Sequence, residues 1–297
     1  MHGCGAKLRP DKGRAVAVID SLHIYPVKGC AGIALQQATL GPAGLQSQGV
    51  GDREWMVVEH PGGQFLTQRQ IPRLALVTPA IGAGVLHLSA PGQPMLELPL
   101  DDIGSRQPTL PVQVWKDECM AFDAGEPAAA WFSGFLGRPV RLARFDPAHQ
   151  RASSMAWTGG MTALNLFSDG YPILLISQAS LDDLNGRLAQ AGRAVLPMNR
   201  FRPNIVLGGV GPYEEDYLLS LGAPGLVFKP VKPCPRCPVP SIEQSTGIPG
   251  PDPLDILAQY RSEKRTGGVV FGQNLITLQG HGETLKVGQE FELEWNF

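Results

Sequence analysis

Two cysteines in a proline-rich segment are the residues of this chain that point most clearly to chemistry. Cys234 and Cys237 form a Cys-Pro-Arg-Cys run between prolines, with Lys232 and Arg236 beside them. Nearby positive charge favours the thiolate, which is the form of cysteine that binds metals or attacks electrophiles. Because proline fixes φ and lacks a backbone donor, we expect residues 229–241 to form a stiff loop rather than a helix. A stiff loop that presents a thiolate suits a soft metal ion.

Other uses of this cysteine pair stay open at the level of sequence. A structural zinc site needs four ligands, but the chain has no second cysteine pair, and its six histidines are scattered singly. A thioredoxin-like dithiol places its first cysteine at a helix N-terminus, which Pro238 and Pro240 oppose. A third interpretation is a pair of buried, unreactive thiols, which the neighbouring cations weaken here. We adopt that interpretation for the remaining cysteines, Cys4, Cys30 and Cys119.

A second set of candidate residues is basic and dispersed along the chain. Its members lie where strands are expected to end or turn: Lys28, Arg53, Arg69, Arg73 and Arg202. Such cations suit a phosphate or carboxylate ligand, although for any one of them a solvated surface charge is the ordinary interpretation. Asp169-Gly170 precedes an apolar run, and this turn either approaches a ligand or only reverses the chain.

The composition limits the class of protein. The chain has 297 residues, 43% of them hydrophobic, and a formal net charge of −2. This hydrophobic content allows a large core and argues against disorder, and the charge argues against a nucleic-acid partner. An odd number of cysteines in a long chain argues against a disulfide scaffold. There is no apolar run long enough to span a bilayer, and residues 1–14 form a polar tail without a signal core. We therefore expect a cytoplasmic protein without a membrane partner.

Short strands and a few helices must position the candidate residues, because 36 glycines and 27 prolines favour frequent turns. In the first half we predict a strand at 15–27, hairpins at 54–60 with 64–67 and 85–89 with 95–98, a strand at 112–115, and a helix at 127–135 that Gly137 ends. In the second half we predict a strand at 173–176, a helix capped by Ser180 and ended by Gly192, a strand at 204–207, a helix capped by Asp252, and strands at 269–278 and 285–295.

These elements predict a β-rich α+β protein made of two barrel-like units with a few short helices. A boundary is plausible near residues 147–165, where Ser, Ala, Thr and Gly gather.

Several runs resemble one known family, and they occur in that family's order. Three runs resemble the β-barrel domain that precedes a MOSC domain, namely IYPVKGC at 24–30, GDREW at 51–55 and TQRQIPR at 67–73. Five later runs resemble the MOSC domain itself: FSD at 167–169, SQASLDDLN at 177–185, FRPNIV at 201–206, CPRC at 234–237 and FGQN at 271–274. Within this family the chain resembles the amidoxime-reducing proteins of mitochondria and their bacterial relatives. The resemblance implies an N-terminal β-barrel domain over 15–147 and a MOSC β-barrel domain over 160–297.

The same resemblance implies a molybdenum cofactor, in which a pterin dithiolene holds molybdenum and carries a phosphate. The family's metal ligand corresponds to Cys237, which would also be the catalytic residue, whereas Cys234 would be structural. The family's cofactor contacts correspond to Lys28, Gly29, Arg53, Asp169, Gly170, Arg202, Asn204 and Cys237. The lysine and arginines would hold the pterin or its phosphate by charge-assisted hydrogen bonds. The chain departs from the family at two places: Gly29 replaces a serine, which concerns one side-chain contact to the cofactor, and 238–241 reads PVPS instead of an aliphatic and threonine run, which concerns the substrate pocket.

The function that the resemblance implies is reduction of small N-hydroxylated (N-oxygenated) substrates, with the oxygen atom removed at molybdenum. The chain ends at Phe297 without the cysteines of an iron–sulfur domain, so we expect electrons from a separate electron-transfer protein. One alternative is a MOSC protein that carries the cofactor, or sulfur on Cys237, without redox turnover of its own. Another is a barrel protein that binds no metal.

Overall fold

The computed structural model describes residues 15–101 and 108–296, so the expected polar tail and Cys4 lie outside the described residues. Strands dominate the described chain, as predicted, and the β-rich α+β class is confirmed. The α-helices are short: α1 (Glu126–Leu136), α2 (Met155–Thr158), α3 (Gln178–Gln190) and α4 (Leu254–Leu257). Among the residues described, no helix combines the length and apolar character needed to cross a membrane.

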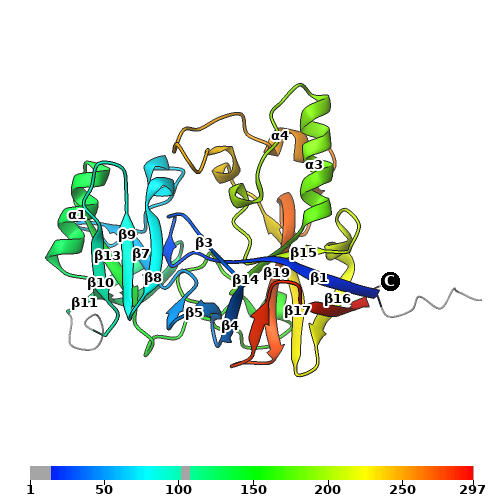
Figure 1. Ribbon diagram of the computed structural model, residues 1–297, viewed down its shortest axis with the longest axis horizontal. Helices are drawn as coiled ribbons and strands as arrows, with labels where there is room; N and C mark the ends of the chain where they lie inside the picture. The colour runs from blue at the N-terminus through cyan, green and yellow to red at the C-terminus, as the bar shows by residue number, and fades with distance from the viewer. Residues whose placement is uncertain (1–14, 102–107, 297) are drawn as a thin grey trace, which may run out of the picture.

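Seven strands close into a barrel (Figure 1). In order around it they are β14 (Ile173–Ser177), β15 (Ile205–Gly208), β1 (Ala15–Ile24), β21 (Glu290–Trp295), β16 (Leu218–Ala223), β17 (Leu226–Pro235) and β19 (Gly268–Gln279), and β19 pairs with β14. The β14–β15 pair is parallel, and the others are antiparallel. Two short strands pair with this sheet, β3 (Ile33–Leu35) with β1 and β18 (Ser262–Glu263) with β19. Closure satisfies the backbone along both sides of each barrel strand.

The first strand of the described chain belongs to this barrel. Figure 1 shows β1, in blue, running to the side of the molecule that holds the yellow and red strands. Its buried side chains change from odd to even positions, from Ala17 and Ile19 to Leu22 and Ile24, because the pairing with β15 shifts register between Ile19 and Ser21. A segment inside the range expected for the N-terminal domain therefore completes the C-terminal barrel. The limits 15–147 and 160–297 stay a prediction.

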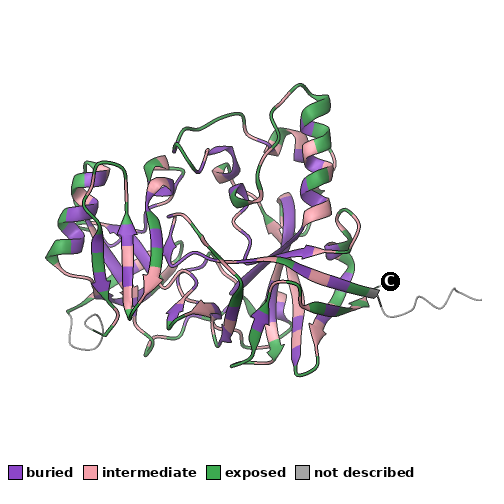
Figure 2. Ribbon diagram, viewed as in Figure 1, coloured by how far each residue is buried: buried purple, intermediate pink, exposed green. Residues whose placement is uncertain are grey.

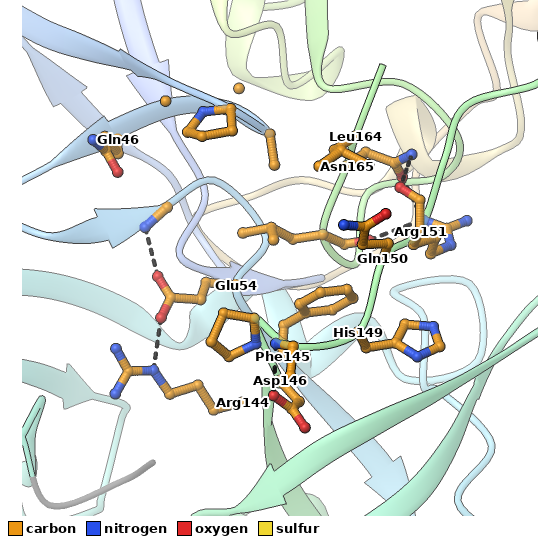
Figure 3. Close-up of a pocket in the computed structure, with 18 of the residues that line it drawn as sticks. Gln46, Glu54, Arg144, Phe145, Asp146, His149, Gln150, Arg151, Leu164 and Asn165 are labelled. Carbon is orange, nitrogen blue, oxygen red and sulfur yellow. Dashed lines mark hydrogen bonds and ion pairs between the residues drawn. The ribbon is translucent and has the colours of Figure 1, made fainter. Parts of the chain in front are cut away.

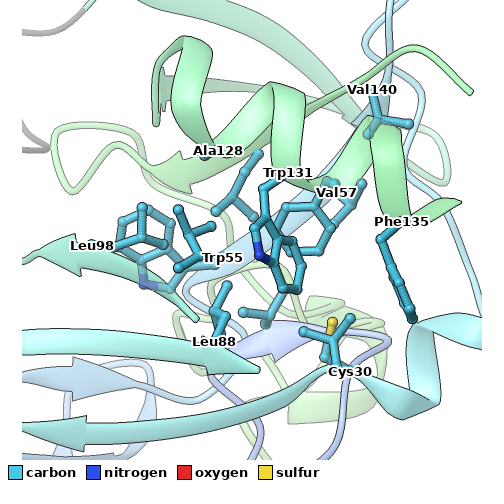
Figure 4. Close-up of a cluster of buried hydrophobic side chains, with 14 of the residues drawn as sticks. Cys30, Trp55, Val57, Leu88, Leu98, Ala128, Trp131, Phe135 and Val140 are labelled. Atoms are coloured by element: carbon cyan, nitrogen blue, oxygen red, sulfur yellow. The ribbon is translucent and has the colours of Figure 1, made fainter. Parts of the chain in front are cut away.

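The other half of the molecule consists of smaller sheets. A five-stranded sheet has the order β11 (Thr109–Val114), β12 (Asp117–Asp123), β13 (Val140–Phe145), β7 (Trp55–Glu59) and β2 (Val27–Lys28). A three-stranded sheet contains β10 (Leu96–Pro99), β9 (Val85–Ser89) and β8 (Thr78–Gly82). Helix α1 packs onto these strands through Trp131 and Phe135, which meet Trp55, Leu88 and Leu98 in one buried cluster (Figure 4).

A small sheet joins the two halves of the sequence. Strand β20 (Thr284–Lys286) pairs with β4 (Gln37–Gly41), followed by β5 (Gly44–Ser47) and β6 (Val50–Gly51). Buried residues recur along the strands of both halves (Figure 2). The sheets and the barrel thus form a packed frame whose loops meet at the candidate site.

Most predicted elements are present, with local differences. Helix 127–135 and hairpin 85–89 with 95–98 are confirmed as α1 and β9–β10. The hairpin predicted from 54–60 and 64–67 is reduced to β7 and an isolated bridge between Val58 and Phe65. The N-cap of α3 is Ser177, whose hydroxyl accepts a hydrogen bond from the Ser180 amide at 3.1 Å, so the prediction of Ser180 as the cap is wrong. The strand predicted at 285–295 is interrupted at Gly288, where φ is +82°.

The prediction that 229–241 is a loop throughout is wrong. Strand β17 continues through Pro235, and a short 3-10 helix follows at Val239–Ser241. The pairing of β17 with β19 shifts register between Pro230 and Lys232 and again between Pro233 and Pro235. Proline has no backbone N–H to donate, so a regular central strand does not tolerate it. The shifts in register accommodate the prolines of β17. Cys234 therefore lies at the end of a barrel strand, and Cys237 lies in the loop after it.

Candidate functional site

One pocket between the barrel and the N-terminal sheets brings together all eight residues that the resemblance singles out. We call it the cysteine pocket, and its cavity volume is about 170 Å³. Its lining includes Lys28, Gly29, Arg53, Asp169, Gly170, Arg202, Asn204 and Cys237. These residues lie at strand ends and turns that are far apart in the sequence. The fold therefore provides the convergence that the site prediction requires.

Lys28, on β2, is buried and forms an ion pair with the exposed Asp169 in the loop before β14. Its Nζ lies 2.6 Å from Asp169 Oδ1 and donates to the Phe167 carbonyl at 2.7 Å. Burial lowers the Lys28 pKa, and the Asp169 charge opposes this effect. Partial desolvation raises the pKa of the Asp169 carboxyl, but the Lys28 charge and hydrogen bonds from Lys28 and Trp115 outweigh it and hold the pKa below its usual range. The Asp169 carboxyl is thus ionised at neutral pH.

Arg53 and Arg202 stack on one buried aromatic ring. Their guanidinium carbons lie 4.4 Å and 4.2 Å from the centre of the Tyr25 ring. Both arginines have left-handed backbone conformations, with φ of +52° and +56°. Arg53 also pairs with Asp52, whereas Arg202 has no carboxylate within ion-pair distance in the part of the chain that the structure describes. Burial lowers the Arg202 pKa to about 10. Arg202 is therefore a charge that an anionic ligand would satisfy.

Asn204 supports the framework of the pocket. Its Oδ1 accepts from the Leu174 amide at 3.0 Å and from Arg53 at 3.3 Å, and its Nδ2 donates to the His23 carbonyl at 3.2 Å. These bonds connect β15 to β14 and β1. Asn204 therefore holds the Arg53 guanidinium in place, in addition to lining the pocket.

The two thiols of the Cys-x-x-Cys pair have different surroundings. Cys234 Sγ accepts a hydrogen bond from Arg236 Nη1 at 3.3 Å, and Arg236 Nη2 donates to the Phe201 carbonyl at 2.8 Å. Arg236 Nε is buried without a partner among the described residues. Cys237 is half-buried, is not in a disulfide and makes no hydrogen bond to the described chain. Cys237 is thus the thiol that is available to a ligand in the pocket.

The two predicted glycines differ in what they require. Gly29 has φ of +85°, a conformation that favours glycine, and its carbonyl accepts from Gln68 Nε2 at 2.7 Å. Gln68 and Gln244 also exchange two side-chain hydrogen bonds of 3.0 Å, which join the N-terminal half to the loop after β17. At Gly170 a Cβ would meet nothing within 4 Å, so this turn borders open space.

The lining of the cysteine pocket is strongly cationic. Five cations and one carboxylate line it: Lys28, Arg53, Arg69, Arg202, Arg236 and Asp169. Arg73, from the same basic set in the sequence, lies elsewhere, with its guanidinium carbon 4.6 Å from the centre of the Phe135 ring. An anionic group is therefore the ligand that this pocket favours.

Four lining or supporting residues were not found by reasoning from the sequence. Tyr25 carries the two stacked arginines, and Gln68 holds the Gly29 carbonyl. The Tyr171 hydroxyl is buried without a partner among the described residues, and burial raises its pKa to about 12. Trp115 lines the pocket from the β11–β12 turn. Tyr25 and Gln68 lie inside two runs that carry the family resemblance, which is a usable signal, whereas nothing local marks Tyr171 or Trp115.

A larger pocket lies elsewhere and contains none of the eight predicted residues (Figure 3). Its volume is about 1130 Å³, and its lining includes Glu54, Arg144, Arg151 and Asn165. Three of its charged groups have partners within the protein, since Glu54 pairs with Arg144 at 2.6 Å and Arg151 bonds Asn165 at 2.5 Å. We therefore take the cysteine pocket, which contains polar groups without partners among the described residues, as the candidate site.

No cluster of three or more His, Cys, Asp or Glu side chains exists within residues 15–101 and 108–296. The described side chains therefore do not form a complete metal site by themselves.

Comparison with known proteins agrees with this arrangement. The MOSC N-terminal beta barrel domain matches residues 16–139, and the MOSC domain matches residues 164–292. Mitochondrial amidoxime-reducing component 1 of Mus musculus is 34% identical over 295 residues, which is 95% of this chain and 84% of that protein. Mitochondrial amidoxime reducing component 2 of Bos taurus is 33% identical, over 86% of this chain and 76% of that protein's length. Molybdenum cofactor sulfurase of Bos taurus is 32% identical over 88% of this chain but only 30% of its own length. The chain therefore belongs to the MOSC-domain family, in the form that joins an N-terminal β-barrel domain to a MOSC domain.

Proposed function

We propose that this protein is a molybdenum-cofactor-dependent reductase of small N-hydroxylated compounds. The observation that carries the proposal is a half-buried thiol, Cys237, which makes no hydrogen bond to the described chain and lines a cationic pocket. The names of the mitochondrial relatives, which describe reduction of amidoximes, support this function.

The residues present fit such a cofactor by their chemistry. A thiolate is a soft ligand that suits molybdenum held by sulfur. Arg202 lacks a carboxylate partner within the described chain, and Arg236 has a buried Nε without an acceptor there. Guanidinium groups recognise phosphate by charge-assisted hydrogen bonds. A cofactor that combines sulfur ligands with a phosphate would therefore satisfy the groups that the protein itself leaves unsatisfied.

Each predicted residue then has a role. Cys237 would ligate the metal, and the remaining seven would hold the pterin and its phosphate: Lys28, Gly29, Arg53, Asp169, Gly170, Arg202 and Asn204. Arg53 and Arg202 are fixed on Tyr25, and Lys28 is fixed by Asp169, so these contacts are pre-organised.

When bound, the cofactor would supply the two electrons that, with two protons, convert an N–OH group into N–H and water. The protein's own contribution is to orient the bound group and to surround the reacting atoms with half-buried side chains. The electrons would come from a separate electron-transfer protein.

A second candidate is a carrier that delivers the cofactor, or sulfur on Cys237, to other enzymes. The match to molybdenum cofactor sulfurase favours this alternative, and so does the second free thiol, Cys234, in the same pocket.

The two functions can be separated with protein produced in cells that synthesise the cofactor. Reduced methyl viologen would serve as electron donor and benzamide oxime as substrate. We expect turnover that Cys237→Ser abolishes and that Cys119→Ser, at a buried thiol of the N-terminal half, leaves unchanged. Loaded protein that shows no turnover but transfers molybdenum to a cofactor-free acceptor enzyme would contradict the reductase proposal and support the carrier.

A further inference from the structure

We propose, on the basis of the reductase function proposed above, that Trp115 is a specificity-determining residue. It would select uncharged N-hydroxylated substrates that carry a planar aromatic group beside the N–OH.

Trp115 lies where the cysteine pocket opens into an outer pocket of about 780 Å³. The two pockets share Phe65, Thr67, Arg69, Trp115 and Asp169 in their linings. A substrate that reaches toward the cysteine pocket through the outer pocket therefore passes the indole ring, and the part of the substrate farthest from the reacting atom would stay beside it.

The backbone at Trp115 is strained. Its φ is +56°, in the left-handed region that large side chains rarely adopt. Only Trp115 and Lys116 separate β11 from β12, and a turn of this length normally uses Asn-Gly or Gly. Trp115 is also 44% exposed, so burial compensates only part of the strain. Strained backbone conformations that the surrounding structure holds in place cluster at functional positions. Trp115, Arg53 and Arg202 all line the cysteine pocket and all have positive φ.

The indole ring is held rigidly by neighbours from both halves of the molecule. Its Nε1 donates to Asp169 Oδ1 at 3.0 Å, the same oxygen that lies 2.6 Å from Lys28 Nζ. The Phe65 ring packs edge-on, with the ring centres 5.0 Å apart. Trp115 therefore presents a fixed aromatic surface, and its orientation is coupled to the Lys28–Asp169 pair.

Arg69 shows which kind of group this surface accepts. Its guanidinium carbon lies 4.9 Å from the centre of the indole ring, and this exposed arginine has no carboxylate partner within the described residues. A planar, delocalised group thus already stacks on the indole, held by few other contacts. An aryl group of a substrate could stack there in its place. The cationic lining disfavours positively charged substrates, so the preferred class is neutral aryl compounds.

The test compares benzamide oxime with acetamide oxime, which share the N–OH group but differ in the aromatic ring. Trp115→Gly removes the indole with its contacts to Asp169 and Phe65, but glycine suits the positive φ, so we expect the variant to fold with a melting temperature close to that of wild type. We expect the ratio of kcat/KM for the aryl over the alkyl substrate to fall about tenfold, mainly through KM, as expected for loss of an aromatic contact. Trp115→Phe should keep most of this preference. Met120→Ala, at an exposed position of β12, is the matched control and should not change the ratio.

Binding of the unreactive analogues benzamide and acetamide to the loaded protein, measured by calorimetry, gives a readout that does not depend on turnover. Loss of the benzamide preference in Trp115→Gly would support the role of Trp115, whether or not wild type reduces the oximes. If wild type reduced neither oxime, that result would contradict the proposed reductase function but not the role of Trp115. Two results would overturn the inference. One is an aryl-over-alkyl ratio in Trp115→Gly that stays within twofold of the wild-type ratio. The other is a loss of affinity or of kcat/KM that is equal for the aryl and the alkyl compound. If Trp115→Gly does not fold, the same ratio is compared between Trp115→Phe, which should keep the aryl preference, and Trp115→Leu, which should lose it.

Discussion

The paired glutamines under the cysteine pocket allow a quantitative test of how the two halves of the molecule are joined. Gln68 and Gln244 are 2% and 9% exposed, and they exchange two hydrogen bonds of 3.0 Å. Gln68 also donates to the Gly29 carbonyl, at the edge of the predicted cofactor site. We therefore expect Gln68→Leu to destabilise the protein and to disturb the pocket together.

The magnitude follows from the partners that Gln68→Leu would leave behind. The Gly29 carbonyl and the Gln244 Oε1 atom would both lose their donor in a buried region, whereas Gln244 Nε2 would keep the Ile242 carbonyl at 3.0 Å. Each buried polar atom without a partner costs about 1–3 kcal/mol. Because leucine adds some apolar burial, we expect the free energy of unfolding to fall by about 2–4 kcal/mol.

The assay is a double-mutant cycle read by urea unfolding. The variant with both Gln68→Leu and Gln244→Leu pairs two apolar side chains, so its loss should be smaller than the combined losses of the single variants, by about 1–2 kcal/mol. Gln178→Leu, which removes only an exposed hydrogen bond to Asp182, is the control and should change stability by less than about 0.5 kcal/mol. A decrease in the free energy of unfolding for Gln68→Leu as small as that of the control would refute this expectation. A double variant whose decrease equals the sum of the two single decreases would refute it as well.

Three further perturbations test other parts of the structure. Burial raises the pKa of the fully buried Glu215, so its contribution to stability is complete below the unfolded value of 4.5 and is lost as the pH rises through the folded-state pKa. As the pH rises from 4 to 8, the urea midpoint of wild type should therefore fall relative to that of Glu215→Gln. A difference between the two midpoints that does not change with pH would contradict this expectation. Arg202→Met should leave the urea midpoint of the cofactor-free protein unchanged or higher, yet reduce molybdenum retention on dialysis about tenfold, and unaltered retention would argue against Arg202 as a cofactor contact. Arg151→Met removes hydrogen bonds to the Asn165 side chain and to the Leu166 and Ser168 carbonyls, so it should lower the free energy of unfolding by about 2–4 kcal/mol. A decrease below about 0.5 kcal/mol would show that the loop at 165–168 is stable without these bonds.

Local sequence patterns predicted the elements whose determinants are local. Leu181, Leu184 and Leu188 recur on one face of α3 and are buried together there. Gly137 ends α1 with φ of +70°, as its position after the apolar run indicates. The cap of α3 was misplaced by three residues because Ser177 and Ser180 are both good caps, and only the geometry of the chain entering from β14 decides between them.

Non-local pairing could not be predicted in this way. Strand β1 closes the barrel against β15 and β21, which lie almost at the other end of the sequence. Strand β17 continues through three prolines because β19 offers an irregular partner, and local propensity alone argues for a loop.

The site was predicted from the resemblance, while its internal organisation was not. The stacking of Arg53 and Arg202 on Tyr25, and the position of Trp115, depend on left-handed conformations at residues that do not favour them. No pattern in the sequence marks such positions, because the surrounding fold imposes them. The cytoplasmic location stays a prediction.

The most direct test of the central claim is the molybdenum content per chain, measured by elemental analysis on protein from cells able to synthesise the cofactor. We expect near-stoichiometric molybdenum in wild type and a marked loss in Cys237→Ser, with Cys119→Ser unchanged. A well-folded wild type without molybdenum, or a Cys237→Ser variant that retains it fully and firmly, would contradict the assignment of this pocket.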